Sequence, residues 1–577
     1  MEESLDNIRP SALEVGSGDE MGVASAEGKT ASRRLRAGLD RALWAARWLG
    51  RELGARGPWM LRASALVAAL SLSFWAGMGP RWDYPYSSHI DEWKHRGDTL
   101  SLIEGGSLVY TNPNPHPHRI GDVRYHRELG FHVLYGFLET TTGLIPSDLH
   151  RIAPAVQMAL LALLVYALGA RYGYGWSAAL LVPLLPTSTR TLGPEFAVPV
   201  AIALLFVPVT LMVVHRLEER GRGESLWLLM VLIGGTLFIH PTTEAVVTGF
   251  TAMALGLGFL QSVVARQYRG AASLAAAIAV RLAVPVLVLQ VWLPGTAVGV
   301  AREALAGEVT GISAALGFNQ GFFGAFGVIG VGLFVVGIVL FTMQARHGLM
   351  SYLLPTTTVS LALYLLVFYP RYSYGPPSIY ERGWVFLGLF MVILAGYAVG
   401  AYFRAVPDMA RAVMRRLTVR REALARAPLF AAGVVVLAAA LYLGLTSEER
   451  WRYTLQYRMV TEAMVADMAW IGDHRPADAN RVFLEPSLAW TFPSLAGVGN
   501  IPWRSSAPPD TDWVIQKAWE MLGSGELDMD FIPRQDIYLI YTCLPGSGRC
   551  NELKAGLPEV REGVYWLPEW RRWRELP

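Results

Sequence analysis

Long apolar runs recur along the chain from residue 59 almost to residue 446. A helix that crosses a bilayer needs roughly 20 consecutive apolar residues, and these runs approach that length between charged residues, Pro or Gly. The pattern therefore predicts a polytopic α-helical membrane protein with about eleven transmembrane helices. Their approximate bounds are 59–79, 152–170, 175–190, 194–214, 225–240, 243–264, 273–294, 321–343, 348–369, 383–403 and 428–446.

The composition agrees with lipid as the main solvent. Of the 577 residues, 53% are hydrophobic and 17% are charged, against about 25% charged in an ordinary soluble domain. A single soluble core could not hide that much apolar surface. The formal net charge of +3 is too small to favour a nucleic-acid partner. Membrane lipids are expected to surround the chain, and no nucleic acid is expected to bind it.

Basic residues fall on alternate connections between the predicted helices, and such connections are typically cytoplasmic. An odd number of spans then places the N-terminus in the cytoplasm and the C-terminus outside, in a multi-pass protein of the plasma membrane. The connections concerned carry Arg171, the 216–222 stretch, Arg266 with Arg269, Arg346 and the 404–426 stretch.

The two ends of the chain differ from the apolar domain predicted at 58–446. Residues 1–30 are polar and poor in aromatics, which indicates a disordered cytoplasmic tail. Residues 31–57 combine seven arginines with Leu and Trp, as in a basic amphipathic helix at the inner leaflet. Residues 447–577 alternate strand-like and helix-like runs, which predicts a small extracytoplasmic α/β domain.

Within this C-terminal domain, Arg481–Leu484 and Ile537–Tyr541 are among the strand-like runs. The chain has two cysteines, Cys543 and Cys550, too few for a thiolate metal cluster or a disulfide-rich scaffold. An extracytoplasmic location is oxidising and would let a disulfide between them persist. They are the disulfide candidate of the chain.

The polar segment 80–151 is the predicted first external loop. Asp91 and Glu92 stand near its start and begin a helix that is expected to run to Ile103 and to break at Gly105–Gly106. A Pro-rich stretch follows, and a second helix along the membrane surface is expected over residues 125–144. A carboxylate partly shielded from water suits a general base or a ligand for a divalent ion. Ordinary solvated acids are the equally weighted alternative.

The order of these motifs resembles the GT-C glycosyltransferases, in particular protein O-mannosyltransferases, lipid A aminoarabinose transferases and oligosaccharyltransferase catalytic subunits. The residues that carry the resemblance are Asp91–Glu92, the run Asn112–Pro117, and Arg151–Pro154 at the start of the second span. The likeness covers about residues 60–215. An insertion from His116 to Arg124 replaces the acidic or lysine residue that the family has beside its double proline, which leaves the donor headgroup open.

The resemblance implies transfer of a sugar, with inversion, from a polyprenyl-phosphate-linked donor to a glycan, lipid or protein acceptor at the outer face of the membrane. Asp91 is the first choice for general base and Glu92 the second. A fixed cation should stabilise the leaving phosphate. Arg371 and Arg382 are candidates for it, with Tyr380 as a partner at headgroup level; simple interfacial anchoring is the alternative for Arg382.

Further substrate contacts are expected on the same side of the membrane. Six of the eleven histidines lie between residues 89 and 132, and hydrogen bonds to sugar or phosphate are their favoured role. Glu195 and His240 head the outer ends of later spans, although an acid at a helix N-terminus also has a capping role. The predicted substrate-binding set is His89, His95, His126, Glu195, His240, Arg371, Tyr380 and Arg382.

A divalent metal, Mg²⁺ or Mn²⁺, is the weaker expectation for this loop. Asp91, Glu92 and His126 would be its ligands if one binds. No cofactor is required by the motifs. Arg281, inside an apolar run, is read either as a side chain that reaches back to the cytoplasmic surface or as a contact to lipid phosphate.

Two other classes of protein compete with the transferase. A secondary transporter or flippase for a lipid-linked or polar substrate would also have many spans and a few intramembrane charges. Its polar residues would gather at the membrane midplane, whereas here they gather in outer loops. A non-enzymatic scaffold is the third class, and it would leave Asp91 and Glu92 without a role.

Overall fold

The computed structural model describes most of residues 59–292, 323–447 and 458–567. The stretches 293–322 and 448–457 between these ranges are not described, and the longest gaps inside the ranges are 112–121 and 503–519. The chain forms two compact units, Met1–Ala63 and Ser64–Pro577. All elements below belong to the second unit, apart from the first residues of α2. The predicted cytoplasmic tail (1–30) and interfacial helix (31–57) lie outside the described residues.

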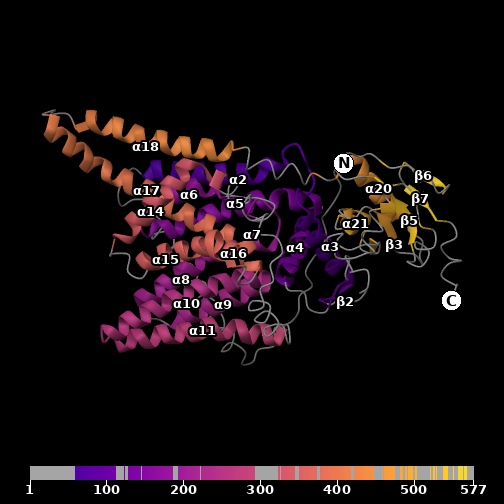
Figure 1. The fold of residues 1–577 in the computed structure, drawn as a ribbon, viewed down its shortest axis with the longest axis horizontal. Helices are drawn as coiled ribbons and strands as arrows, with labels where there is room; N and C mark the ends of the chain where they lie inside the picture. The colour runs from indigo at the N-terminus through magenta and orange to yellow at the C-terminus, as the bar shows by residue number, and fades with distance from the viewer. Residues whose placement is uncertain are drawn as a thin grey trace, which may run out of the picture. The chain divides into compact units, whose positions relative to one another are not determined.

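Helices dominate the described part of the chain (Figure 1). Eight helical stretches there are long and apolar enough to cross a membrane, and three apolar helices are shorter. Each of the eleven runs predicted from the sequence overlaps one of these stretches, while the count of eleven spans stays a prediction. The long helices are α2 (Trp59–Met78), α5 (Pro146–Ala170), α7 (Pro199–Leu204) with α8 (Phe206–Arg220), α10 (Pro241–Val264), α11 (Tyr268–Trp292), α15 (Met350–Leu363) with α16 (Tyr369–Tyr372), α17 (Pro377–Leu417) and α18 (Glu422–Leu445). The shorter ones are α6 (Gly175–Leu181), α9 (Gly223–Ile239) and α14 (Val328–Thr342).

Helix α17 is the central helix of this group. It packs against α6, α14 and α18, and its apolar stretch is almost wholly buried. Gly396 permits the contact with α6, because a Cβ there would lie 2.3 Å from Cα of Ala178; small residues let membrane helices approach this closely. The Ser177 hydroxyl also donates to the Gly396 carbonyl at 2.6 Å.

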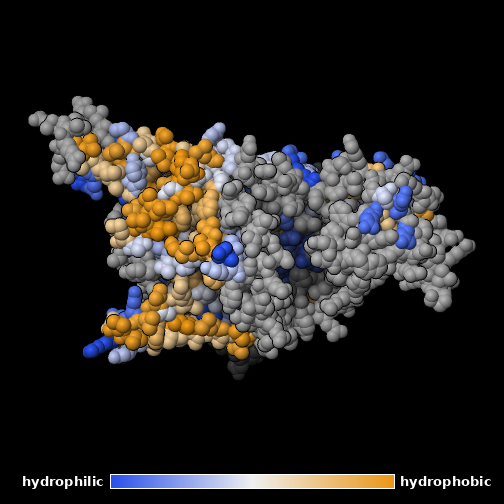
Figure 2. Space-filling view, in the orientation of Figure 1, coloured by the Kyte–Doolittle hydropathy of each residue, from blue (hydrophilic) through white to orange (hydrophobic). Residues whose placement is uncertain are grey.

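Outer helices leave apolar side chains exposed (Figure 2). Val286 and Leu287 on α11, Val335 on α14, and Val435 and Tyr442 on α18 are each about half exposed or more. Contiguous apolar surface of this kind is rare on soluble monomers. The described helices therefore have the surface expected of a bundle in lipid.

The segment after α2 folds into two helices that pack on each other, α3 (Ile90–Gly105) and α4 (Leu129–Thr142). Gly106 ends α3 with a φ of 56°, a left-handed conformation that favours glycine. The expected helix through Ile103 and its break at Gly105–Gly106 are thus confirmed. Between the two helices, β1 (Tyr110–Thr111) pairs with β2 (Asp122–Val123), and the Pro-rich run 112–117 lies outside the described residues.

The C-terminal part contains a five-stranded mixed sheet in the order β4-β3-β5-β7-β6. Its strands are β3 (Arg481–Leu484), β4 (Ile501–Pro502), β5 (Ile537–Tyr541), β6 (Glu559–Arg561) and β7 (Val564–Trp566). The two strand-like runs expected at 481–484 and 537–541 coincide with β3 and β5. Helices α20 (Glu462–Asp473) and α21 (Phe492–Ala496) share a hydrophobic core with this sheet, and Trp93 of α3 belongs to the same core.

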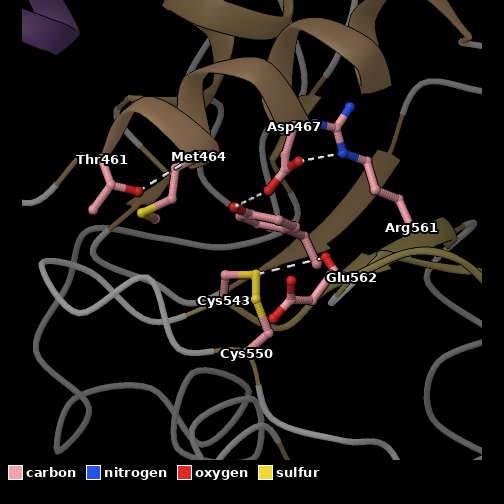
Figure 3. The surroundings of a disulfide bond; sticks show 8 residues. Thr461, Met464, Asp467, Cys543, Cys550, Arg561 and Glu562 are labelled. Atoms are coloured by element: carbon pink, nitrogen blue, oxygen red, sulfur yellow. Dashed lines mark hydrogen bonds and ion pairs between the residues drawn. A yellow bond between two sulfur atoms is a disulfide. The ribbon is translucent and has the colours of Figure 1, made fainter.

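A disulfide, a side-chain hydrogen bond and an ion pair connect elements of this sheet region (Figure 3). Cys543, just after β5, is bonded to Cys550. Asp467 of α20 accepts a hydrogen bond from the Tyr541 hydroxyl at 3.3 Å and pairs with Arg561 of β6 at 2.5 Å. Burial raises the pKa of Asp467 above its usual value, against the opposing effect of Arg561. Through Asp467, these contacts connect α20 to β5 and to β6.

Candidate functional site

Glu92 lies in the first turn of α3, and its side chain is fully buried. Its carboxylate accepts hydrogen bonds from Arg81 at 2.5 Å and from the backbone N–H groups of Ala197, Ser88 and His89 at 2.6, 2.7 and 3.1 Å. The Ser88 hydroxyl donates a fifth at 3.4 Å. His89 is the N-cap of α3 and Glu92 is its third residue, which together form a capping box. Glu92 therefore joins the end of α2, the start of α3 and the loop before α7.

Asp91 points to a different environment from Glu92. Its side chain is 30% exposed, and Oδ2 lies 3.8 Å from Nη2 of Arg382 in the first turns of α17. The backbone N–H of Asp91 donates to Nδ1 of His89 at 3.0 Å. The fold thus brings together the two residues that the sequence proposes as base and as phosphate-binding cation, although 290 positions separate them in the chain.

Glu195 lies in the loop next to the Glu92 network and is fully buried. Arg81 donates to its backbone carbonyl at 2.6 Å. The following residue, Phe196, places its ring 5.1 Å from that of His89. Both Glu195 and His89 are therefore close to the start of α3.

His240 caps the N-terminus of α10 and faces the same region. Its Nδ1 accepts the backbone N–H of Thr243 at 3.1 Å, so the ring proton sits on Nε2. Nε2 lies 3.5 Å from Oε1 of Glu128, and the other oxygen of Glu128 lies 3.8 Å from Nε2 of His95. Burial lowers the pKa of His240 to about 3, with a further lowering from the positive charge of Arg382. His240 is accordingly a neutral donor at any physiological pH.

Tyr380 and Arg371 lie beside an irregular turn between α15 and α16. Residues Tyr364–Phe368 form a π-helical turn, which accommodates Pro370 because proline has no N–H and its ring crowds the carbonyl of the preceding turn. The Tyr380 ring stacks on Tyr369 with centroids 4.0 Å apart. Arg371 is exposed, and no contact joins it to Asp91 among the described residues.

Sequence reasoning missed two charged residues of this region. Arg81 forms the buried pair with Glu92, and Glu128 lies between His95 and His240. A charge at the very end of a predicted span was the available signal for Arg81. For Glu128, the signal was a carboxylate within the histidine-rich stretch. The predicted contact His126 lies outside the described residues.

The described residues around Asp91 do not form a ligand set for Mg²⁺ or Mn²⁺. The oxygens of Glu92 already accept five hydrogen bonds. Asp91 is the remaining acid of the predicted set, and it is paired with an arginine. A hard dication needs several oxygen ligands, so no step is assigned to a metal at this point.

Arg281 takes neither of the two roles considered for it. It is fully buried between α10 and α11, with Nη2 3.2 Å from Oε1 of Glu244 and Nε donating to the Thr251 hydroxyl at 2.8 Å. Thr248 donates to the same Glu244 oxygen at 2.8 Å. The charge is thus satisfied by a neighbouring helix.

Neither a protein-family model nor a curated protein matches the sequence, but solved structures match the fold. The apo form of the oligosaccharyltransferase from Archaeoglobus fulgidus matches with a TM-score of 0.54 and 11% identity, over 83% of this chain and 69% of that chain. The same archaeal enzyme, AglB, in complex with an inhibitory peptide and a dolichol-phosphate gives 0.53 and 12% over the same shares. The chain has the GT-C fold.

A second GT-C structure matches less closely. ArnT from Cupriavidus metallidurans bound to undecaprenyl phosphate has a TM-score of 0.47 and 13% identity, over 76% of this chain and 85% of that chain. The archaeal oligosaccharyltransferase matches confirm, at the level of the fold, the GT-C resemblance expected from the Asp-Glu pair and the loop order. In this fold, Asp91 lies in the first turn of α3, the α-helix that follows α2.

Proposed function

We propose that the protein is an inverting glycosyltransferase that moves a sugar from a polyprenyl-phosphate-linked donor to an acceptor at the outer face of the plasma membrane. The observation that carries the proposal is the 3.8 Å approach of Asp91 and Arg382. An acid and a fixed cation at that distance are what a displacement at an anomeric carbon beside a phosphate requires. The GT-C fold supports it, and AglB has been solved with a dolichol-phosphate.

In the proposed reaction, Asp91 takes the proton of the acceptor nucleophile while that nucleophile bonds to the anomeric carbon. The bond from that carbon to the phosphate oxygen breaks, and polyprenyl phosphate leaves with the electron pair. Arg382 donates hydrogen bonds to the leaving phosphate and stabilises its charge. The acceptor is a glycan, a lipid or a protein.

We assign Glu92 a positioning role. Its carboxylate accepts five hydrogen bonds and is fully buried, so it has little room left for a substrate group. By holding Arg81 and the N-terminus of α3, Glu92 fixes the turn on which Asp91 lies. This ranks the two acids in the order that the sequence suggested, with Asp91 first.

The remaining predicted contacts are proposed to line the donor and acceptor sites. His89 contacts the backbone of Asp91, and Glu195 contacts Arg81, the partner of Glu92. His95 and His240 both face Glu128. Tyr380 and Arg371 would meet the lipid phosphate nearer the surface. We further propose that the C-terminal sheet region is extracytoplasmic and that the N-terminus is cytoplasmic.

The test is a transfer assay with polyprenyl-phosphate sugars and purified full-length protein. Asp91→Asn should lower turnover by about 10²–10⁴-fold, the usual contribution of a general base. Asp473→Asn changes an exposed acid at the end of α20 and should transfer sugar at the wild-type rate. Wild-type turnover in Asp91→Asn would refute the assignment of the base.

The buried Arg281–Glu244 pair favours one alternative, a transporter or flippase, because intramembrane ion pairs often line substrate paths. In proteoliposomes, that function would appear as movement of lipid-linked sugar across the bilayer without any acceptor. The transporter would be the better assignment if the wild type moved lipid-linked sugar without transferring it and if Glu244→Gln lost this movement.

A further inference from the structure

Three side chains of the types that ligate metals lie close together where α3 packs on α4. His95 and Asp98 are three residues apart on α3, a spacing that places them on one helical face, and His132 belongs to α4. One ligand atom of each lies within 4.8 Å of those of the other two. All three side chains are buried. Within the described part of the chain, no other group of three His, Cys, Asp or Glu residues is this close.

The hydrogen bonds of Thr99 determine the tautomer of His132. The Thr99 hydroxyl donates its single proton to the carbonyl of His95 at 2.9 Å. The 3.1 Å contact between Thr99 Oγ1 and His132 Nδ1 must therefore be donated by the imidazole. The proton of the neutral ring lies on Nδ1, and Nε2 carries a lone pair. A ligating histidine is typically held in this way, through its other ring nitrogen.

A second carboxylate supports the cluster from outside. Glu128 has one oxygen 3.8 Å from Nε2 of His95 and the other 3.5 Å from Nε2 of His240. Since His240 is neutral and has its proton on Nε2, it can hold Glu128 beside His95. A carboxylate next to a ligating imidazole orients the ring and makes it a stronger ligand.

We propose that His95, Asp98 and His132 bind a divalent transition-metal ion, with zinc as the preferred ion, and that this ion clamps α3 to α4. Two imidazoles and one carboxylate suit zinc, whereas magnesium prefers oxygen ligands. Zinc bonds of roughly 2.0–2.1 Å place ligand atoms about 3.4 Å apart, so small side-chain rotations close the site. The charges of Asp98 and Glu128 balance the dication.

The site includes neither Asp91 nor Arg382, the groups proposed to act in sugar transfer, although His95 is also a predicted substrate contact. Asp98 lies seven residues after Asp91 on α3, which corresponds to about 10 Å along the helix axis. The ion is therefore a structural support for the helix that begins at the active site, and its binding does not depend on whether the protein transfers sugar.

The experiment uses full-length protein in detergent micelles, stripped with a chelator and titrated with zinc chloride against a chromophoric competitor. We expect one zinc ion per chain. Asp98→Ala and His132→Ala should weaken binding by more than about 100-fold. Thr99→Val, which removes the acceptor for His132 Nδ1, should weaken it by about 10–100-fold. His474→Ala removes an exposed histidine on α20 and should bind zinc as the wild type does.

Two outcomes would overturn the proposal. One is a wild-type protein that retains no stoichiometric zinc after desalting. The other is zinc affinity in Asp98→Ala and His132→Ala equal to that of the wild type. If these variants fail to fold, X-ray absorption of the zinc-loaded wild type decides the matter, because the proposal requires scattering from two imidazoles. Asp91→Asn separates the two hypotheses: it should lose transfer and keep zinc.

Discussion

Asp91 and Glu92 are neighbours in sequence, yet the two sides of α3 on which they lie are unlike. Glu92 and Arg81 are fully buried at 2.5 Å, whereas Asp91 and Arg382 are 30% and 24% exposed at 3.8 Å. The carboxylate of Glu92 accepts five hydrogen bonds from the protein. The carboxylate of Asp91 has a looser partner and access to solvent. The difference separates a carboxylate that is enclosed by the fold from a carboxylate that solvent can reach.

The largest effect on stability should come from breaking the buried pair. Arg81→Met leaves the Glu92 charge buried without its main partner, and such a change typically lowers the free energy of unfolding by about 3–5 kcal/mol. Unfolding in detergent micelles measures it. Arg411→Met is the control, because Arg411 pairs with Asp408 on an exposed surface of α17. Equal stability of these two variants would contradict the contrast drawn above.

The exposed pair should affect turnover and leave the fold intact. Arg382→Gln removes the cation proposed to stabilise the leaving phosphate, so turnover should fall by about 10²–10³-fold. Because both partners are partly exposed, the free energy of unfolding should change by less than about 1 kcal/mol. Parallel transfer and unfolding assays distinguish these effects. If Arg382→Gln lowered the free energy of unfolding strongly and left turnover unchanged, Arg382 would have a structural role and not the proposed catalytic one.

Glu139, a buried acid of α4, should have an intermediate effect on stability, and this effect should depend on pH. Burial raises the pKa of Glu139 from 4.5 to about 7, although Arg96 opposes the shift. The folded chain therefore binds this proton more tightly than the unfolded chain, and stability is lost as the pH rises from about 4.5 to about 7. Glu139→Gln should remove up to about 3 kcal/mol of this loss. Unfolding curves at pH 5 and pH 7.5 should diverge between variant and wild type.

The smallest effect should follow from Asp83→Asn. Asp83 forms two hydrogen bonds with Arg458, at 2.6 and 2.8 Å, and these lower its pKa, but its side chain is 69% exposed. Exposed pairs contribute little, so the free energy of unfolding should change by less than about 0.5 kcal/mol. A loss comparable to that of Arg81→Met would mean that burial does not distinguish these pairs.

Local signals predicted the elements more accurately than the ends of the membrane helices. The bounds of α3, β3 and β5 were close to the expected ones, because a glycine stop or a short β-branched run marks them. Helix α5 begins at Pro146, six residues before the expected 152, and α17 continues to Leu417, well past 403. Hydropathy marks where a helix enters lipid, whereas the helix itself ends where its backbone hydrogen bonds end.

The sequence predicted which residues belong to the candidate site, but it did not predict which of them contact one another. Asp91, Arg382 and His240 stand out by residue type and by position near the ends of spans. Which acid of the Asp-Glu pair is buried depends on Ala197 and Arg81, and these come from other parts of the chain. The convergence of His95, Asp98 and His132 likewise depends on how α3 packs on α4.

The sequence by itself determined that the chain is a helical membrane protein, where its apolar helices and main strands lie, and that its polar chemistry gathers after the first span. Those properties follow from hydrophobicity and from local backbone preferences, which act within a few residues. Only the tertiary structure decided that Glu92 is buried with Arg81, that Asp91 meets Arg382, and that Arg281 pairs with Glu244. Each of these pairs joins charges on different elements of the fold, and the packing of those elements fixes the distance between them.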